Sequence, residues 1–231
     1  MEAYSSDQEQ IDEIKKWLRD NGMAIVVGIA VGFGGLYGWK EWKDYVNNRA
    51  EQASTLYSRI IFNMDNAQTG SVQQATDELI KDYSATPYAA LAALAAAKVA
   101  IVDDNRDKAK ERLQWVIDNT NQPQLVPLAK LRLARMYLVD KNIDGASKLL
   151  EGVTYPDAYA ARVAELQGDL YGLRGETALA RNAYNLALSA ALPVRNQEMV
   201  KIKLDELEPV AGPESSAQEP ASAASSEGAV Q

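Results

Sequence analysis

The 231-residue sequence contains neither cysteine nor histidine. Without cysteine it can form no disulfide, thiolate nucleophile or zinc–thiolate site. Without histidine it lacks the Ser-His-Asp arrangement and imidazole metal ligands. Acidic residues exceed basic ones, 32 against 24, giving a net charge of −8 that disfavours nucleic acid as a partner. We expect no enzyme, no cofactor and no metal, since an enzyme would have to use carboxylates, lysine or tyrosine alone.

The longest stretch without charge covers residues 21–39, and its apolar part is residues 23–39, MAIVVGIAVGFGGLYGW. As a helix it would rise about 26 Å, which with some headgroup overlap just crosses a hydrocarbon core of roughly 30 Å. Trp17 precedes this stretch and Trp39 ends it, so aromatic side chains stand where both membrane interfaces would lie. We predict a transmembrane helix over residues 22–42, preceded by an amphipathic segment over 1–21.

Two other interpretations of this stretch are a buried helix of a soluble protein and a cleaved signal peptide. A signal peptide fits poorly, because the preceding segment is acidic and bulky aromatics occupy the cleavage position.

Basic residues are equally numerous on the two sides of the apolar stretch, so charge does not set the orientation of the predicted membrane helix. Glycines four residues apart would let another membrane helix approach, or would only reflect how common glycine is in spanning helices. These candidate packing residues are Gly28, Gly32, Gly34 and Gly38.

From residue 43 to 208 apolar residues recur at intervals of three and four, which predicts an all-α domain of helix pairs. Four times a small residue is followed four positions later by a bulky one, at spacings of 34, 37 and 34 residues. The small residues are Ala75, Ala109, Ala146 and Ala180. This pattern resembles the tetratricopeptide repeat, in which small residues mark helix crossings. The unit that contains Gly168 matches best, whereas Asn63 makes the first unit degenerate.

The remaining residues, 209–231, include three prolines, six alanines, five serines and three glutamates, with no aromatic or basic residue. This composition predicts a disordered tail. It is either an acidic interaction segment or simply a solvated end.

The order and spacing of several motifs over residues 1–208 resemble the YfgM-like ancillary subunits of the bacterial SecYEG translocon. The motifs are Asn21-Gly22, the span glycines, Gly38-Trp39-Lys40-x-Trp42, Leu131-Arg132-Leu133-Ala134-Arg135, the Gly168 unit, Glu198-Met199 and Lys203-Leu204-x-x-Leu207. The resemblance implies a single-pass inner-membrane protein with a cytoplasmic N-terminus and a periplasmic repeat domain over 43–208. It also implies association with SecYEG and a PpiD-like periplasmic chaperone, and transfer of exported polypeptides onward. A scaffold for another envelope assembly is the alternative, and the tail departs from the family.

In tetratricopeptide arrays the first helix of each pair lines the concave surface. We therefore predict a groove that holds an extended or helical apolar segment of a partner or client. Alternatively, its leucines belong to the core, where apolar residues of helices usually lie. The predicted groove residues are Leu91, Leu94, Lys98, Ile101, Leu128, Leu131, Arg135, Leu138, Arg162, Glu165 and Asp169.

Overall fold

The computed structural model describes residues 3–192, 194 and 196–207, and the predicted tail over 209–231 lies outside them. The described residues form α-helices and two short 3-10 helices and contain no strand, which confirms the all-α prediction. The chain divides into two compact units, Met1–Val126 (unit 1) and Pro127–Gln231 (unit 2).

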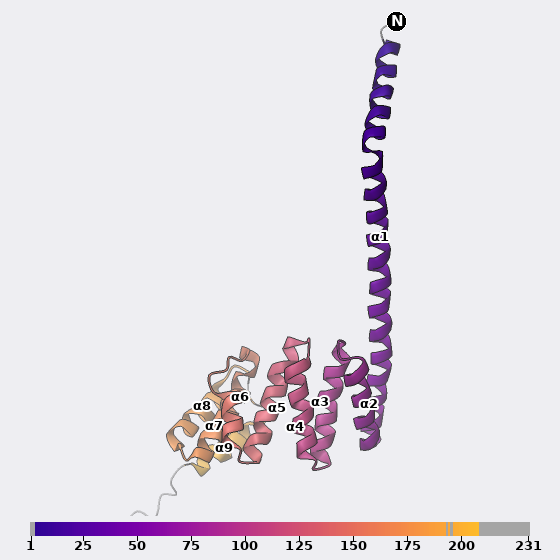
Figure 1. The fold of residues 1–231 in the computed structure, drawn as a ribbon. Coiled ribbons are helices and arrows are strands. Elements are labelled where there is room, and N and C mark those ends of the chain that lie inside the picture. The colour runs from indigo at the N-terminus through magenta and orange to yellow at the C-terminus, as the bar shows by residue number, and fades with distance from the viewer. Residues whose placement is uncertain (1–2, 193, 195, 208–231) are drawn as a thin grey trace, which may run out of the picture. The chain divides into compact units, whose positions relative to one another are not determined.

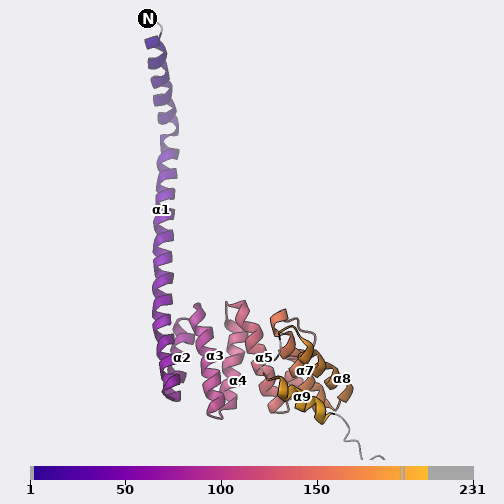
Figure 2. The same ribbon diagram turned by 180° about the vertical axis from the view of Figure 1, so that it is seen from behind.

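Unit 1 begins with α1 (Ala3–Asp65), a single helix of 63 residues that extends far beyond α2 and α3 (Figures 1 and 2). Its apolar part contacts no other part of the described chain, and Val31, Phe33 and Trp39 are each about 70% exposed. In the described part of the chain α1 is the one helix long and apolar enough to cross a membrane. A bare apolar stripe of this size requires a lipid or protein partner, because water solvates it poorly. A helix buried in a soluble core, the first alternative, is not observed.

We expect the full-length chain to stay with the membrane after an alkaline carbonate wash. Aspartate at both Val31 and Phe33 should release a large part of it, because each charge at the centre of a span costs about 2.5–3.5 kcal/mol. The measurement is the partition of the chain between pellet and supernatant. Leucine at the same two positions is the matched control and should leave the chain in the pellet. Release of the unaltered chain by carbonate would contradict the assignment of a membrane helix.

The last turns of α1 pack against α2 (Thr69–Asp82) and α3 (Pro87–Val102), and α3 also packs against α4 (Arg106–Asn119). Ile60, Val72 and Leu79 are fully buried at the centre of this unit. Seven of the nine buried residues of α3 are alanines, so three neighbouring helices can approach its backbone closely. α1 therefore continues without a break from the apolar stretch into the first helix pair.

Unit 2 contains the remaining helix pairs and a terminal helix. The short helix η1 (Pro123–Leu125) ends unit 1. The elements that follow are α5 (Val126–Val139), α6 (Ile143–Leu150), η2 (Asp157–Tyr159), α7 (Ala160–Arg174), α8 (Thr177–Ser189) and α9 (Gln197–Glu206). One core cluster joins α5, α6 and α7 around Leu150 and Leu166. A second joins α7, α8 and α9 around Tyr184 and Val200.

The turn inside each helix pair repeats the same backbone geometry. One residue of each turn has a positive φ, between 54° and 75°, at intervals of 37, 37 and 34 residues. These residues are Ala67, Asp104, Lys141 and Gly175. In every case the next residue donates its N–H to the carbonyl five residues earlier, at 2.8–2.9 Å, which caps the C-terminus of the first helix. Four equivalent turns support the tetratricopeptide-like repeat and include the first unit, which the sequence predicts to be degenerate.

Candidate binding groove

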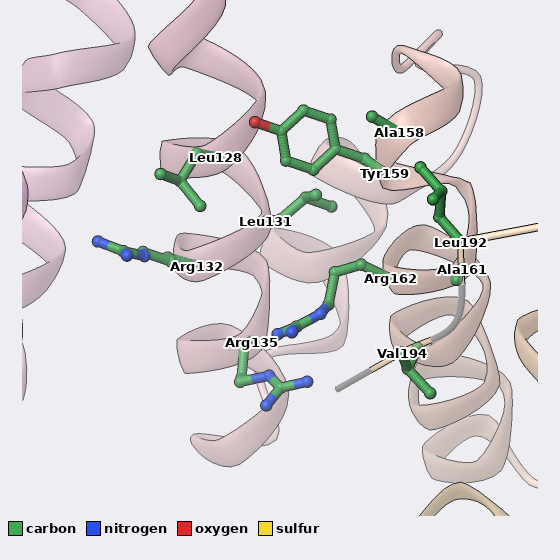
Figure 3. Close-up of a pocket in the computed structure, with 10 residues that line it drawn as sticks. All are labelled: Leu128, Leu131, Arg132, Arg135, Ala158, Tyr159, Ala161, Arg162, Leu192 and Val194. Carbon is green, nitrogen blue, oxygen red and sulfur yellow. The ribbon is translucent and has the colours of Figure 1, made fainter. Parts of the chain in front are cut away.

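A cavity of about 460 Å³ lies in unit 2 between α5 and the start of α7 (Figure 3). The loop that precedes α9 closes one side of it. We call it the arginine groove, because three of its wall residues are arginines and none is acidic. The wall residues are Leu128, Leu131, Arg132, Arg135, Ala158, Tyr159, Ala161, Arg162, Leu192 and Val194.

Helical spacing explains why α5 contributes four of these residues. Counted from Leu128, they occupy positions i, i+3, i+4 and i+7, which form one face of a helix. From this face Leu131 and Arg135 extend toward α7, whereas Arg132 leaves α5 on the side away from α7 in Figure 3.

On the opposite wall, the η2 turn follows Pro156 and places Tyr159 immediately before α7. Arg162 comes three residues later, so both side chains reach from the α7 side toward α5 (Figure 3). The groove therefore combines an apolar floor with guanidinium groups from both of its walls.

A buried carboxylate holds two of the arginines. Glu165 of α7 is only 8% exposed and accepts a hydrogen bond of 2.7 Å from Nη2 of Arg135. The Nε atom of Arg162 lies 3.6 Å from its other oxygen. A buried carboxylate requires such partners, since desolvation without them would cost several kcal/mol. Glu165 therefore fixes the positions of the arginines and is not itself open to a ligand.

Asp169 is also engaged within the protein. Its Oδ1 accepts hydrogen bonds from Nζ of Lys203, at 2.6 Å, and from the hydroxyl of Tyr184, at 2.8 Å. Burial of the Tyr184 ring, followed by the negative charge of Asp169, raises the pKa of this phenol. Tyr184 consequently remains a hydrogen-bond donor to Asp169 at physiological pH. The pair ties α7 to α8, and Lys203 adds α9.

Arg132 differs from the other two arginines, because no acidic residue in the described part of the chain lies within ion-pair distance of it. Partial desolvation of its guanidinium, and then the positive charge of Arg162, lower the pKa of Arg132. It remains charged all the same, since an arginine does not lose its proton in a protein. A ligand that carries negative charge would relieve this repulsion between like charges.

The structure brings four of the predicted groove residues of unit 2 together: Leu128, Leu131, Arg135 and Arg162. Leu138 is instead buried in the core cluster of α5, α6 and α7, where Leu131 also packs with its other face. Glu165 pairs with Arg135 and Arg162, and Asp169 with Lys203 and Tyr184, and neither carboxylate is among the wall residues of the groove.

The four predicted groove residues of unit 1 all lie on α3. Leu94 is buried and Leu91 half-buried, whereas Lys98 and Ile101 are exposed. The predicted role of these four residues in partner binding stays a prediction.

Sequence reasoning missed several wall residues. Arg132 could have been found, because it is four residues after Leu128 and shares its helix face. Tyr159, Leu192 and Val194 come from a turn and a loop, where no periodicity marks them.

The span glycines are exposed along α1. A Cβ atom added at Gly28, Gly32, Gly34 or Gly38 would meet no other atom within 4 Å. Their predicted role in helix packing within the membrane stays a prediction.

These features define a class: a tetratricopeptide-like helical-repeat protein that carries one long apolar helix near its N-terminus. Residues 15–209 match the family described as tetratricopeptide repeat-like domain, and the chain belongs to that family. Ancillary SecYEG translocon subunits of Escherichia coli K12, Haemophilus influenzae and Aggregatibacter actinomycetemcomitans are 28%, 29% and 28% identical to it. The alignments cover 89–90% of this chain and 99–100% of each relative, which confirms the resemblance predicted from the sequence. No solved structure matches the chain.

Proposed function

We propose that this chain is a non-enzymatic ancillary subunit of the Sec translocon. The observation that carries the proposal is the similarity over about nine tenths of the chain to three relatives that bear this name. The apolar part of α1 supports a single crossing of the bacterial inner membrane. In this arrangement the N-terminus is cytoplasmic and the repeat domain periplasmic.

Within that role, the arginine groove holds a segment of a partner protein. The partner is a PpiD-like periplasmic chaperone or an exported polypeptide that the subunit passes onward. Apolar side chains of the segment pack on Leu128 and Leu192, and its polar groups accept hydrogen bonds from the arginines. Binding and release of this kind need no covalent chemistry.

The proposal is tested by isolating the full-length chain from membranes in mild detergent and identifying what comes with it. SecYEG subunits and a PpiD-like chaperone should co-purify in amounts comparable to the bait. A consistent set of other envelope proteins without SecYEG would instead identify a scaffold of a different assembly. Crosslinks from the surface of unit 2 would then locate the partner contact.

Replacing Leu128 and Leu192 with asparagine should weaken capture of the partner at least tenfold. Each leucine loses about 1.5–3 kcal/mol of apolar burial if its side chain is covered in the complex. Leu192 is exposed and Leu128 half-buried, and neither packs in the two described core clusters of α5–α9, so the fold should be retained. The measurement is the amount of chaperone and translocon retained by the variant, with circular dichroism as a check of folding.

The matched control replaces Leu179 and Leu186 with asparagine. Both leucines are exposed on α8 and lie outside the arginine groove. The control variant should retain partners as the unaltered chain does. If both variants lose partners equally, or neither loses them, the groove does not bind the partner. This result would not affect the assignment to the translocon.

A further inference from the structure

We propose that the acidic tail of this chain, residues 208–231, docks in the arginine groove of the same molecule and competes there with partner segments. Competition of the tail with partner segments rests on the proposed function, whereas docking of the tail in the groove does not. The groove and the start of the tail belong to the same unit, so the proposal concerns unit 2 alone.

Charge complementarity favours this occupant. The wall of the groove carries three arginines and no acid, in a chain whose net charge is −8. The tail carries four glutamates and no basic residue: Glu208, Glu214, Glu219 and Glu227. Arginine guanidinium groups match carboxylates in geometry as well as in charge, because each can donate two parallel hydrogen bonds.

The composition of the tail also suits the apolar part of the wall. Pro209, Pro213 and Pro220 are spaced along it among alanines and serines, with no side chain larger than glutamine or glutamate. Proline-rich segments favour the extended polyproline conformation, which docks on aromatic surfaces at low entropic cost. Tyr159 and Leu192 offer such a surface beside the arginines.

The tail is also long enough to reach the groove. It begins after Leu207, whose carbonyl accepts a hydrogen bond of 3.3 Å from Nη2 of Arg181 on α8. Val194, a wall residue, comes just before the ten-residue α9, which spans about 15 Å. The root-mean-square span of a flexible chain of 24 residues is about 25–29 Å, which exceeds the length of α9. Tethering at such a length gives an effective concentration in the millimolar range, so a weak contact suffices to occupy the groove.

Arg132 is the arginine most available to the tail, because the described chain supplies it with no acidic partner. Arg162 is the next, since its ion pair with Glu165 is long at 3.6 Å. Arg135 is committed to Glu165 at 2.7 Å. We therefore expect docking to depend mainly on Arg132 and Arg162.

The test adds a fluorescein-labelled peptide of sequence 208–231 to two forms of the protein in nanodiscs, the full chain and a variant ending at Leu207. The peptide should bind the shortened variant at least tenfold more tightly than the full chain, because the attached tail occupies the groove in the latter. Binding should weaken as salt is raised. Equal affinity for both forms, or binding to neither, would overturn the proposal.

Charge variants identify the site. In the shortened variant, Arg132→Gln with Arg162→Gln should reduce peptide binding at least tenfold, and a peptide with all four glutamates replaced by glutamine should bind as poorly. Lys141→Gln with Lys148→Gln removes the same charge from exposed positions outside the groove and should leave binding unchanged. Equal effects of both pairs would overturn the assignment of the site.

Dilution separates a tail that docks on its own chain from one that docks on a second copy. The attached tail protects the groove of the full chain from the added peptide, and this weakening of peptide binding should not change over a hundredfold dilution of the protein. Protection that disappears on dilution would overturn docking within one molecule. The peptide assay contains no translocon or chaperone, so a negative result would contradict tail docking without contradicting the proposed function. Conversely, absence of SecYEG from the co-purified proteins would contradict the proposed function without contradicting tail docking.

Discussion

Replacing Gly168 with alanine is expected to lower the free energy of unfolding of unit 2 by about 2 kcal/mol, through overpacking at the crossing of α7 and α8. A Cβ atom at this position would lie 2.4 Å from the Tyr184 ring, well inside van der Waals contact. The ring has little freedom to move, because it is 5% exposed and its hydroxyl is bonded to Asp169 at 2.8 Å. Alanine favours a helix over glycine by up to about 1 kcal/mol, which offsets part of an overpacking cost of typically 1–3 kcal/mol.

Gly172 provides the matched control, since it lies one turn further along the same helix and a Cβ atom there would meet nothing within 4 Å. Gly172→Ala should leave stability unchanged or raise it by up to about 1 kcal/mol. The measurement is hydrogen exchange of the α7 and α8 amides in the full-length chain under increasing urea. Equal behaviour of the two variants would mean that the α7–α8 crossing does not require a small residue at Gly168.

The same steric relation explains why the repeat could be predicted from sequence. Gly145 in the preceding unit would place a Cβ atom 2.9 Å from the ring of Tyr137, so a small residue faces an aromatic there as well. Small residues at fixed spacing are needed wherever two helices cross closely, and this need leaves a periodic trace in the sequence. The membrane helix could be predicted from the sequence for a similar reason, because the thickness of a bilayer sets the length of the apolar stretch.

The groove was harder to predict, because a position on a first helix does not decide between wall and core. Leu131 and Leu138 are seven residues apart on α5 and both are buried in the core cluster of α5, α6 and α7, yet only Leu131 also reaches the wall of the groove. The difference depends on where η2 and the loop before α9 lie, and neither has a periodic pattern. Similarly, nothing in the spacing shows that Glu165 is buried and neutralised by cations from other helices.

Arg112 is another residue whose place the sequence does not reveal. On a charged helix such as α4 it is expected to face solvent, but its side chain is only 4% exposed. Its Nη2 lies 2.5 Å from Oδ1 of Asp77, and its Nε donates to Oε1 of Gln73 at 3.3 Å. Gln73 in turn donates to the carbonyl of Ala96, so one polar network links α2, α3 and α4.

Replacing Asp77 with alanine should therefore destabilise unit 1 by about 2 kcal/mol. An arginine cannot lose its charge, so Arg112 would keep a buried guanidinium with a single neutral acceptor. Loss of one partner of a fully buried pair costs about 3–5 kcal/mol, and the 60% exposure of the Asp77 side chain reduces this figure. Adding Arg112→Met should restore stability to within about 1 kcal/mol, because a flexible apolar side chain fills the same space without a charge.

Trp115 provides the measurement, since it packs against the core of unit 1 and its fluorescence reports urea unfolding of that unit in the full-length chain. Glu111→Ala is the control: it breaks an exposed pair with Lys108 on the same helix and should cost no more than about 0.5 kcal/mol. If the double variant is less stable than Asp77→Ala alone, Arg112 stabilises the unit through its packing and its bond to Gln73. In that case the guanidinium of Arg112 is solvated without Asp77, and burial of the Arg112 side chain does not require an ion pair with Asp77.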